Sequence, residues 1–324
     1  MSYRIINYPN PVERSEYEAA TEKMLQRLSE EKNILSVYSI GSVGNLGISD
    51  LDMVVVVEDQ KVIQQNYLLD LSLRERYLFT HNLYAISTSD FEKAGRFTFF
   101  HNYILNSGPE LRSQQTPSAL DSELLKKQVA LEFIVKMYIN TTLQETYKVL
   151  RMRDVLLHVK ALMYDFDFLS LDHHPFKERV NTVIKWRKEW FDHTPGHDEI
   201  VRWWNLFCKE LFDFTAEVLR DYDFFLPDKP SFQISKNIVL VPRLTGPPSI
   251  KHKGILLPNF LSTGGKKFFR LQNRVNRFEF YLPAKQKDIA PLIQQKFEFE
   301  SALSSYGKKY LPYFLPLTSS LHLH

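Results

Sequence analysis

Apolar residues recur at different spacings along the chain, and the changes in spacing divide it into three parts. In the first part, short apolar runs alternate with polar segments, as in strands connected by helices. In the second, apolar residues recur every three or four positions, which predicts helices. The third again contains runs typical of strands. The pattern predicts an α+β protein with domains at 1–118, 119–226 and 227–324.

The first part is expected to begin with a long helix. Asn10 and Pro11 suit a helix start, and Glu13 stands where a capping-box acid belongs. The expected elements are a helix to about residue 32, strands over 34–40 and 52–58, a helix over 60–74, a strand over 77–86 and an ambiguous apolar segment over 98–105.

The remaining elements follow from the helical periodicity and from two later apolar runs. They are helices over 124–147, 149–166, 175–191 and 198–222, strands over 234–241 and 278–282, and a helix over 289–306. Pro and Gly mark the breaks between several of them. We therefore expect a small mixed sheet with flanking helices, followed by a helical domain and an α+β region.

One stretch, residues 39–57, concentrates the candidate chemistry. Asp50 and Asp52 stand two residues apart where a strand begins, so both side chains should project to the same face. Two like charges this close are unfavourable unless a cation lies between them, and Mg²⁺ prefers oxygen ligands of this kind. Gly41 permits a tight turn or a close backbone approach. Ser42 offers a hydroxyl and an N–H to a phosphate.

The order of these residues resembles that of the DNA-polymerase-β-type nucleotidyltransferase superfamily. The matching features are a helix, a strand ending in Gly41-Ser42, a short loop, and Ser49-Asp50-x-Asp52 before an apolar strand. The resemblance implies transfer of a nucleoside monophosphate from a nucleoside triphosphate (NTP) to an acceptor, with release of pyrophosphate. It also implies that both aspartates bind Mg²⁺ or Mn²⁺ and act in catalysis, and that Gly41, Ser42 and Ser49 contact the nucleotide.

The sequence departs from this family in two ways. Only seven residues separate the Gly-Ser pair from the first aspartate, so the loop over the triphosphate would be short. The family also has a third carboxylate on the next strand, whereas residues 77–86 contain no Asp or Glu. His81 or Asn82 occupies that place. His81 is the candidate base, with Glu110 as an alternative. Otherwise the chain is a non-catalytic nucleotide- or RNA-binding member of this fold.

The acidic motif has two other interpretations. Asp is common at turns, so the stretch is also compatible with an ordinary strand–turn–strand. An Asp-x-Asp motif is also found in nucleotide-sugar glycosyltransferases, but there the apolar strand precedes the acids. Here residues 53–57 follow them, which favours the nucleotidyltransferase interpretation.

Composition agrees with a globular protein in a reducing compartment. The 324 residues are 44% hydrophobic and 24% charged, which is ordinary for such proteins. Cys208 is the only cysteine, so an internal disulfide is excluded. The first residues lack the apolar core of a signal peptide, and no apolar stretch reaches about 18 residues. We expect a cytoplasmic protein without a membrane partner.

The net charge of +3 is distributed unevenly. The region from Lys229 to Lys285 contains eleven basic residues and a single acidic residue, Glu279. Such a region favours an anionic partner. Aromatic residues such as Phe268 and Phe278 lie among the basic ones, which suits RNA, although core packing explains them equally well. The acceptor itself is expected to be anionic or a small molecule.

Overall fold

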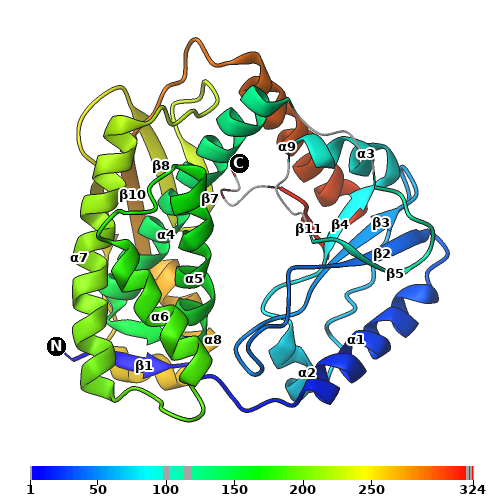
Figure 1. The fold of residues 1–324 in the computed structure, drawn as a ribbon, viewed down its shortest axis with the longest axis horizontal. Helices are drawn as coiled ribbons and strands as arrows, with labels where there is room; N and C mark the ends of the chain where they lie inside the picture. The colour runs from blue at the N-terminus through cyan, green and yellow to red at the C-terminus, as the bar shows by residue number, and fades with distance from the viewer. Residues whose placement is uncertain (1, 98–101, 113–117, 319–320, 322, 324) are drawn as a thin grey trace. The chain divides into compact units, whose positions relative to one another are not determined.

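The chain is a mixed α+β protein that divides into two compact units. The computed structural model describes residues 2–97, 102–112, 118–318, 321 and 323 (Figure 1). The smaller unit comprises residues 10–122 and 295–319, and the larger unit comprises residues 1–9, 123–294 and 320–324. This division differs from the three consecutive domains expected, because a C-terminal segment returns to the smaller unit.

A five-stranded sheet forms the centre of the smaller unit, in the order β11-β4-β3-β2-β5. The central pair, β2 and β3, is antiparallel. The strands are β2 (Ile34–Ile40), β3 (Asp52–Val57), β4 (Tyr84–Ser87), β5 (Ile104–Ser107) and β11 (Leu315–Pro316). The two strands predicted over 34–40 and 52–58 are confirmed. Of the ambiguous segment over 98–105, residues 98–101 lie outside the described residues.

Helices cover both faces of this sheet. Helix α1 (Arg14–Ser29) packs Met24 and Leu28 into a core that also contains Val55 of β3. On the other face, Phe91 of α3 (Thr88–Phe97) lies with its ring centroid 5.3 Å from that of Tyr38. Helix α9 (Pro291–Tyr310) corresponds to the helix predicted over 289–306. Because β3 is buried on both sides, it is a continuous apolar run rather than an alternating one.

The capping residues correct two of the predicted helices. Glu13 is the N-cap of α1 itself, and Glu16 is the capping-box acid. The helix predicted over 60–74 is wrong, because Ser72 and Glu75 form a capping box that starts the short helix α2 (Leu73–Leu78) instead. The strand predicted over 77–86 is correspondingly reduced to β4, and His81 lies in the segment before it.

The larger unit contains the four predicted helices. They are α4 (Ala119–Tyr147), which begins just before this unit, α5 (Met152–Phe168), α6 (Lys177–Glu189) and α7 (His197–Asp221). Two short strands that were not predicted, β1 (Arg4–Ile6) and β6 (Val149–Arg151), pair in parallel. In the part of the chain that the structure describes, no helix is both long and apolar enough to span a membrane.

The basic region forms a four-stranded sheet in the order β7-β8-β10-β9. Its elements are β7 (Phe232–Ser235), β8 (Ile238–Arg243), β9 (Ser249–Gly254), the 3₁₀ helix η1 (Asn259–Gly264), α8 (Lys266–Val275) and β10 (Asn276–Pro283). Phe278 and Phe280 of β10 are buried, each with its ring 5.9 Å from a tyrosine of α4. Phe268 is also buried. These aromatics therefore belong to the core and are not free to stack on nucleotide bases.

An ion pair links α1 to α2 and predicts a dependence of stability on pH. Lys23 Nζ lies 2.6 Å from Oε1 of Glu75. This hydrogen bond, followed by that from the N–H of Ser72, lowers the pKa of Glu75 to about 2. Because the pKa is depressed in the folded state, the stabilisation is present at neutral pH and is lost between about pH 5 and pH 2. Glu75→Gln should lower stability at pH 7 by about 1 kcal/mol, since solvent screens a surface pair.

Urea unfolding followed by circular dichroism at pH 7 and pH 3 measures this effect. The control is Glu92→Gln, which changes an exposed glutamate of α3. The difference between the parent and Glu75→Gln should shrink at pH 3. A difference that stays constant between the two pH values would contradict the assignment.

Candidate functional site

A short turn joins β2 to β3 and carries the glycine–serine pair and the first aspartate. Gly41 and Gly47 have positive φ angles of 77° and 74°, which glycine adopts without steric strain. The N–H of Ser49 donates to the carbonyl of Asn45 at 2.8 Å. The hydroxyl of Ser49 accepts from the N–H of Asn45 at 3.1 Å. Local hydrogen bonds therefore fold these residues into a compact turn.

Two tyrosines attach this turn to the neighbouring helices. Tyr17 of α1 is buried, and its hydroxyl donates to the carbonyl of Ser49 at 2.8 Å. The same hydroxyl accepts from the N–H of Gly47 at 3.0 Å. Tyr77 of α2 donates to the carbonyl of Gly47 at 2.5 Å. Helices α1 and α2 thus fix the point at which β3 begins. The periodicity of apolar residues can place Tyr17 on the buried side of α1, but it gives no information on the contacts of the hydroxyl.

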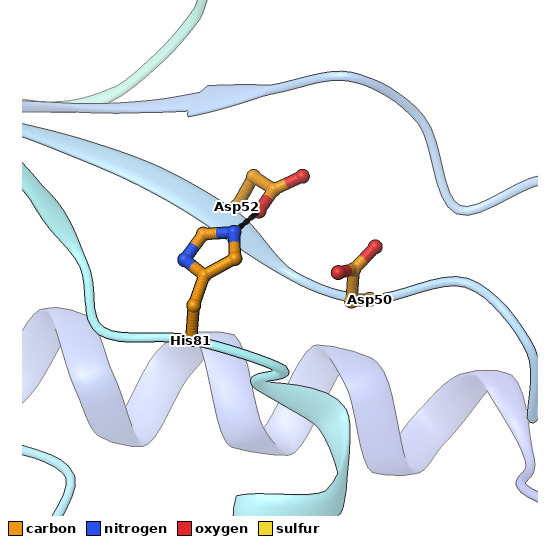
Figure 2. A group of neighbouring side chains, drawn as sticks. All are labelled: Asp50, Asp52 and His81. Carbon is orange, nitrogen blue, oxygen red and sulfur yellow. Dashed lines mark ion pairs between the residues drawn. The ribbon is translucent and has the colours of Figure 1, made fainter. Parts of the chain in front are cut away.

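The carboxylates of Asp50 and Asp52 lie near each other at the start of β3, as their spacing predicts (Figure 2). The N–H of Leu51 donates to the carbonyl of Leu78 at 2.8 Å, which ties this segment to the end of α2. The hydroxyl of Thr80 donates to Oδ2 of Asp50. The segment that follows α2 therefore supplies the contacts that orient the first aspartate.

His81 completes a group of three donor side chains. One ligand atom from His81, Asp50 and Asp52 can be chosen so that all three lie within 4.8 Å of one another. Nε2 of His81 lies 2.8 Å from Oδ1 of Asp52 (Figure 2). Its Nδ1 lies 2.7 Å from the carbonyl oxygen of Asn82. Of the two residues considered for the third position, it is His81 that contacts Asp52.

The surroundings of Asp52 favour a positive charge beside it. Burial lowers the pKa of His81, but the hydrogen bond and charge of Asp52 and the contact with Asn82 outweigh it, so this pKa lies above its usual value. Burial, and then the charges of Asp52 and Asp50, raise the pKa of Tyr84. Apart from its contact with His81, the buried Oδ1 of Asp52 has no hydrogen-bond partner among the described residues. A proton on His81 or a metal ion would each compensate this oxygen.

The donor set fits a divalent cation. Carboxylate oxygens suit Mg²⁺ and Mn²⁺, and an imidazole nitrogen suits transition metals. The contact of Thr80 with Asp50 and that of Asn82 with His81 resemble the outer-shell contacts that orient metal ligands. The described residues contain no other group of three His, Cys, Asp or Glu side chains with this spacing.

A pocket of about 560 Å³ opens beside the aspartates. Gly41, Ser42, Asp50 and Asp52 all line it, so the structure brings the glycine–serine pair and the acidic pair to one cavity. Ser49 is not among the lining residues. Its hydroxyl is used within the turn, and its expected contact with the nucleotide gains no support.

Acidic side chains dominate the charge of this pocket. Glu18 and Glu22 of α1 line it together with the two aspartates, whereas Arg14 is the basic lining residue. Such a pocket repels a bare triphosphate and accepts one that carries divalent cations. The pattern of apolar residues placed the first helix against the sheet, but it gave no reason to assign Glu18 and Glu22 to a site.

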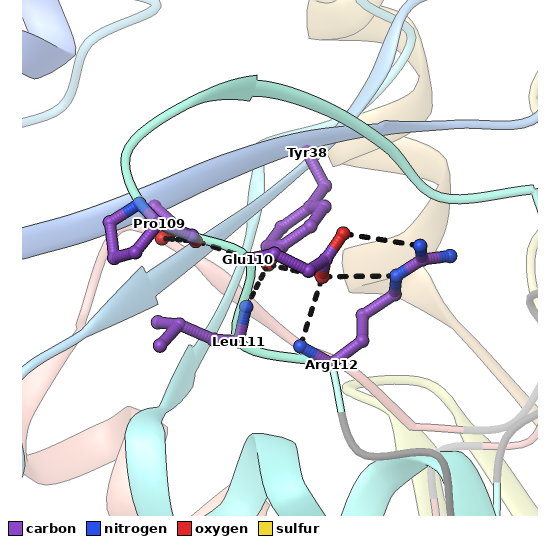
Figure 3. A network of polar contacts seen from close by, with 6 residues as sticks. Tyr38, Pro109, Glu110, Leu111 and Arg112 are labelled. Carbon is purple, nitrogen blue, oxygen red and sulfur yellow. Dashed lines mark hydrogen bonds and ion pairs between the residues drawn. The ribbon is translucent and has the colours of Figure 1, made fainter.

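Glu110 does not line this pocket and instead belongs to a network of polar contacts with Tyr38 and Arg112 (Figure 3). Its Oε1 accepts from the hydroxyl of Tyr38 at 2.9 Å and from the backbone N–H of Arg112 at 3.0 Å. The hydrogen bond from the Arg112 side chain is the main cause that lowers the pKa of Glu110. Ile104, the first residue of β5, lines the pocket. Glu110 is not among the residues that line the pocket, so its role as an alternative base gains no support.

The two hydrogen bonds of the Tyr17 hydroxyl predict that Tyr17→Phe loosens the turn. The N–H of Gly47 would lose a buried partner, as would the carbonyl of Ser49, which should lower stability by about 1–3 kcal/mol. Urea unfolding followed by circular dichroism measures the loss, and amide hydrogen exchange should locate it in residues 44–51.

Tyr67→Phe is the matched control in the same unit. Tyr67 is equally buried, but its hydroxyl has no hydrogen-bond partner among the described residues. Its removal should be neutral or slightly stabilising. Equal losses in the two variants would show that the Tyr17 hydroxyl does not hold the turn.

Comparison with known proteins adds no relative to this description. No family model matches the chain, and neither a curated protein nor a solved structure is significantly similar to it. The function is therefore inferred from the residues and geometry of the pocket.

Proposed function

We propose that the smaller unit is a nucleotidyltransferase, which moves a nucleoside monophosphate from an NTP to an acceptor and releases pyrophosphate. The observation that carries this proposal is the common pocket of the glycine–serine pair and the acidic pair. The order of these residues on a helix, a strand, a short turn and a second strand also supports it. A small mixed sheet with flanking helices suits this interpretation.

The pocket residues have distinct roles in binding the substrate. The hydroxyl of Ser42 and the backbone next to Gly41 bind the outer phosphates, since glycine permits a close approach. Asp50 and Asp52 hold Mg²⁺ or Mn²⁺. Such an ion would supply positive charge that offsets the charge developing on the phosphates during an in-line displacement. Thr80 and His81 keep the two carboxylates oriented.

The transfer step needs an acceptor hydroxyl, a base and a leaving group. The acceptor oxygen forms a bond to the α-phosphorus while the bond from phosphorus to the pyrophosphate oxygen breaks. Glu18 and Glu22 are the pocket carboxylates that do not belong to the acidic pair. One of them accepts the proton of the acceptor hydroxyl. Pyrophosphate leaves with the electron pair of the broken bond.

The outer face of the basic sheet favours a second role, binding of single-stranded RNA. This face lies opposite the one that packs on α4, because Arg277, Glu279 and Tyr281 alternate with buried residues of β10. Lys253 of β9 is directly opposite Arg277. Nζ of Lys253 and Nε of Arg277 each lie 3.3 Å from Oε1 of Glu279. The single negative charge of Glu279 balances only one of these two positive charges. Like charges directly opposite each other are destabilising, and a phosphate would relieve that cost.

Two further residues extend this basic face. Lys251 is exposed on β9 and lies directly opposite Glu279. Arg243 of β8 is exposed, and its guanidinium lies 4.1 Å from the ring centroid of Tyr281. An arginine packed on a tyrosine provides a flat, cationic surface for a nucleotide base. The face thus combines phosphate-binding charge with one stacking position.

The proposed transfer predicts loss of activity in the double variant Asp50→Ala/Asp52→Ala. Each NTP, labelled at the γ-phosphate, is incubated with the protein and Mg²⁺ or Mn²⁺, and release of labelled pyrophosphate is measured. Since loss of an outer-shell partner alone costs roughly 10–100-fold, removal of both carboxylates should reduce the rate by more than about 100-fold.

Asp70→Ala, which changes an exposed aspartate of the same unit, is the control. Release of pyrophosphate that persists in the double variant would refute the mechanism. Tight NTP binding without release in the parent would favour the alternative of a non-catalytic nucleotide-binding protein.

The proposed RNA-binding face predicts weaker RNA binding by the triple variant Lys251→Glu/Lys253→Glu/Arg277→Glu. Fluorescence anisotropy measures binding of a labelled single-stranded RNA at several salt concentrations. The parent should lose affinity steeply with salt, and removal of three cations should reduce the slope of log K against log salt by about 2.

Lys185→Glu/Lys188→Glu/Lys209→Glu is the matched control, with the same change of charge at exposed positions on α6 and α7. Equal loss in the two triple variants would attribute binding to net charge alone. Binding that does not depend on salt would exclude the sheet face as the contact.

A further inference from the structure

The site differs from a purely acidic metal site in one donor. Two of its ligand atoms are carboxylate oxygens, from Asp50 and Asp52, and the third is an imidazole nitrogen from His81. Oxygen donors alone suit Mg²⁺, whereas imidazole suits first-row transition ions. The identity of residue 81 therefore bears on the choice of ion.

The hydrogen bond at Nδ1 fixes which nitrogen of His81 is available. A backbone carbonyl only accepts hydrogen bonds, so Nδ1, 2.7 Å from the carbonyl oxygen of Asn82, carries a proton. In the neutral ring this leaves a lone pair on Nε2, the nitrogen that faces Asp52. Histidines that bind metals almost always donate their other ring N–H to a carbonyl or carboxylate.

The distances within the group suit ligands of one ion. Ligands at about 2.1 Å from an ion and at right angles to each other lie about 3 Å apart. Nε2 of His81 and Oδ1 of Asp52 are 2.8 Å apart. Oδ1 of Asp52 is also buried and has no other hydrogen-bond partner among the described residues. The hydroxyl of Thr80 engages Oδ2 of Asp50, as an outer-shell donor does for a ligating carboxylate.

We propose that Nε2 of His81 is the third protein ligand of a divalent metal ion held with Asp50 and Asp52, and that this site prefers Mn²⁺ or another first-row transition ion to Mg²⁺. This inference concerns the same site as the proposed nucleotidyl transfer and gives its ion. The competing arrangement is a direct ion pair, in which a protonated His81 neutralises Asp52 and the ring takes no part in binding the ion.

Mn²⁺ binding to the full chain without nucleotide tests the inference. Electron paramagnetic resonance measures the free Mn²⁺, and competition with Mg²⁺ gives the ratio of the two affinities. Electron spin-echo modulation should detect a nitrogen coupled to the bound Mn²⁺. His81→Ala should abolish this coupling and weaken Mn²⁺ binding by about 10-fold or more, since loss of an outer-shell partner alone costs roughly 10–100-fold.

His81→Asp provides the sharper comparison. It replaces the imidazole by a carboxylate, so the preference for Mn²⁺ over Mg²⁺ should fall by about 10-fold or more while a metal site is retained. Asn82→Ala is the control, because the carbonyl that His81 contacts belongs to the backbone and is kept. Circular dichroism verifies that each variant is folded.

The possible outcomes separate this inference from the proposed function. Nitrogen coupling that is lost in His81→Ala supports the inference even if no NTP is turned over. Unchanged or tighter Mn²⁺ binding in folded His81→Ala overturns it and favours the ion pair. An affinity ratio that is the same in the parent and His81→Asp also overturns it, whether or not the protein transfers nucleotides.

Discussion

The negative charge of Asp50 and Asp52 at the start of a buried strand is the constraint on which the smaller unit depends. Residues 53–57 are fully buried, so the strand that follows the two aspartates is held in the core. The negative charge of the carboxylates must therefore be compensated by groups that lie beside them. Thr80 contacts the first aspartate and His81 the second, and both belong to the segment that follows α2.

The turn before β3, which carries Asp50, is held by two helices, α1 and α2, that are distant in sequence. Tyr17 of α1 and Tyr77 of α2 hold the turn before β3 from two sides. The ion pair of Lys23 with Glu75 joins the same two helices. Within the turn, backbone groups of Asn45, Gly47 and Ser49 are hydrogen-bonded locally or to tyrosines. Its geometry is therefore fixed by the surrounding fold, and the pocket needs no long loop to form.

Sequence patterns predicted what depends on continuous burial, but not what depends on particular polar contacts. The apolar run of β3 and the periodic helices of the larger unit were predicted well, because burial determines both. The helix over 60–74 was wrong because apolar spacing suggested a helix where the capping box of Ser72 decides the start. Strand β9 was missed because it is largely polar and exposed. The contact of His81 with Asp52 joins two separate segments, so no local pattern specifies it. The roles of Glu18 and Glu110 likewise depend on tertiary structure.

In the family that the acidic motif resembles, one carboxylate both holds the ion and activates the acceptor hydroxyl. In this chain, residues 77–86, where that carboxylate is expected, contain neither Asp nor Glu. The nitrogen next to Asp52 comes from a loop, and the spare carboxylates, Glu18 and Glu22, come from α1. In the proposed site, the loop that carries His81 helps to bind the ion, whereas α1 supplies the base that activates the acceptor hydroxyl. Each can then be removed without the other, since a substitution on α1 leaves His81 in place.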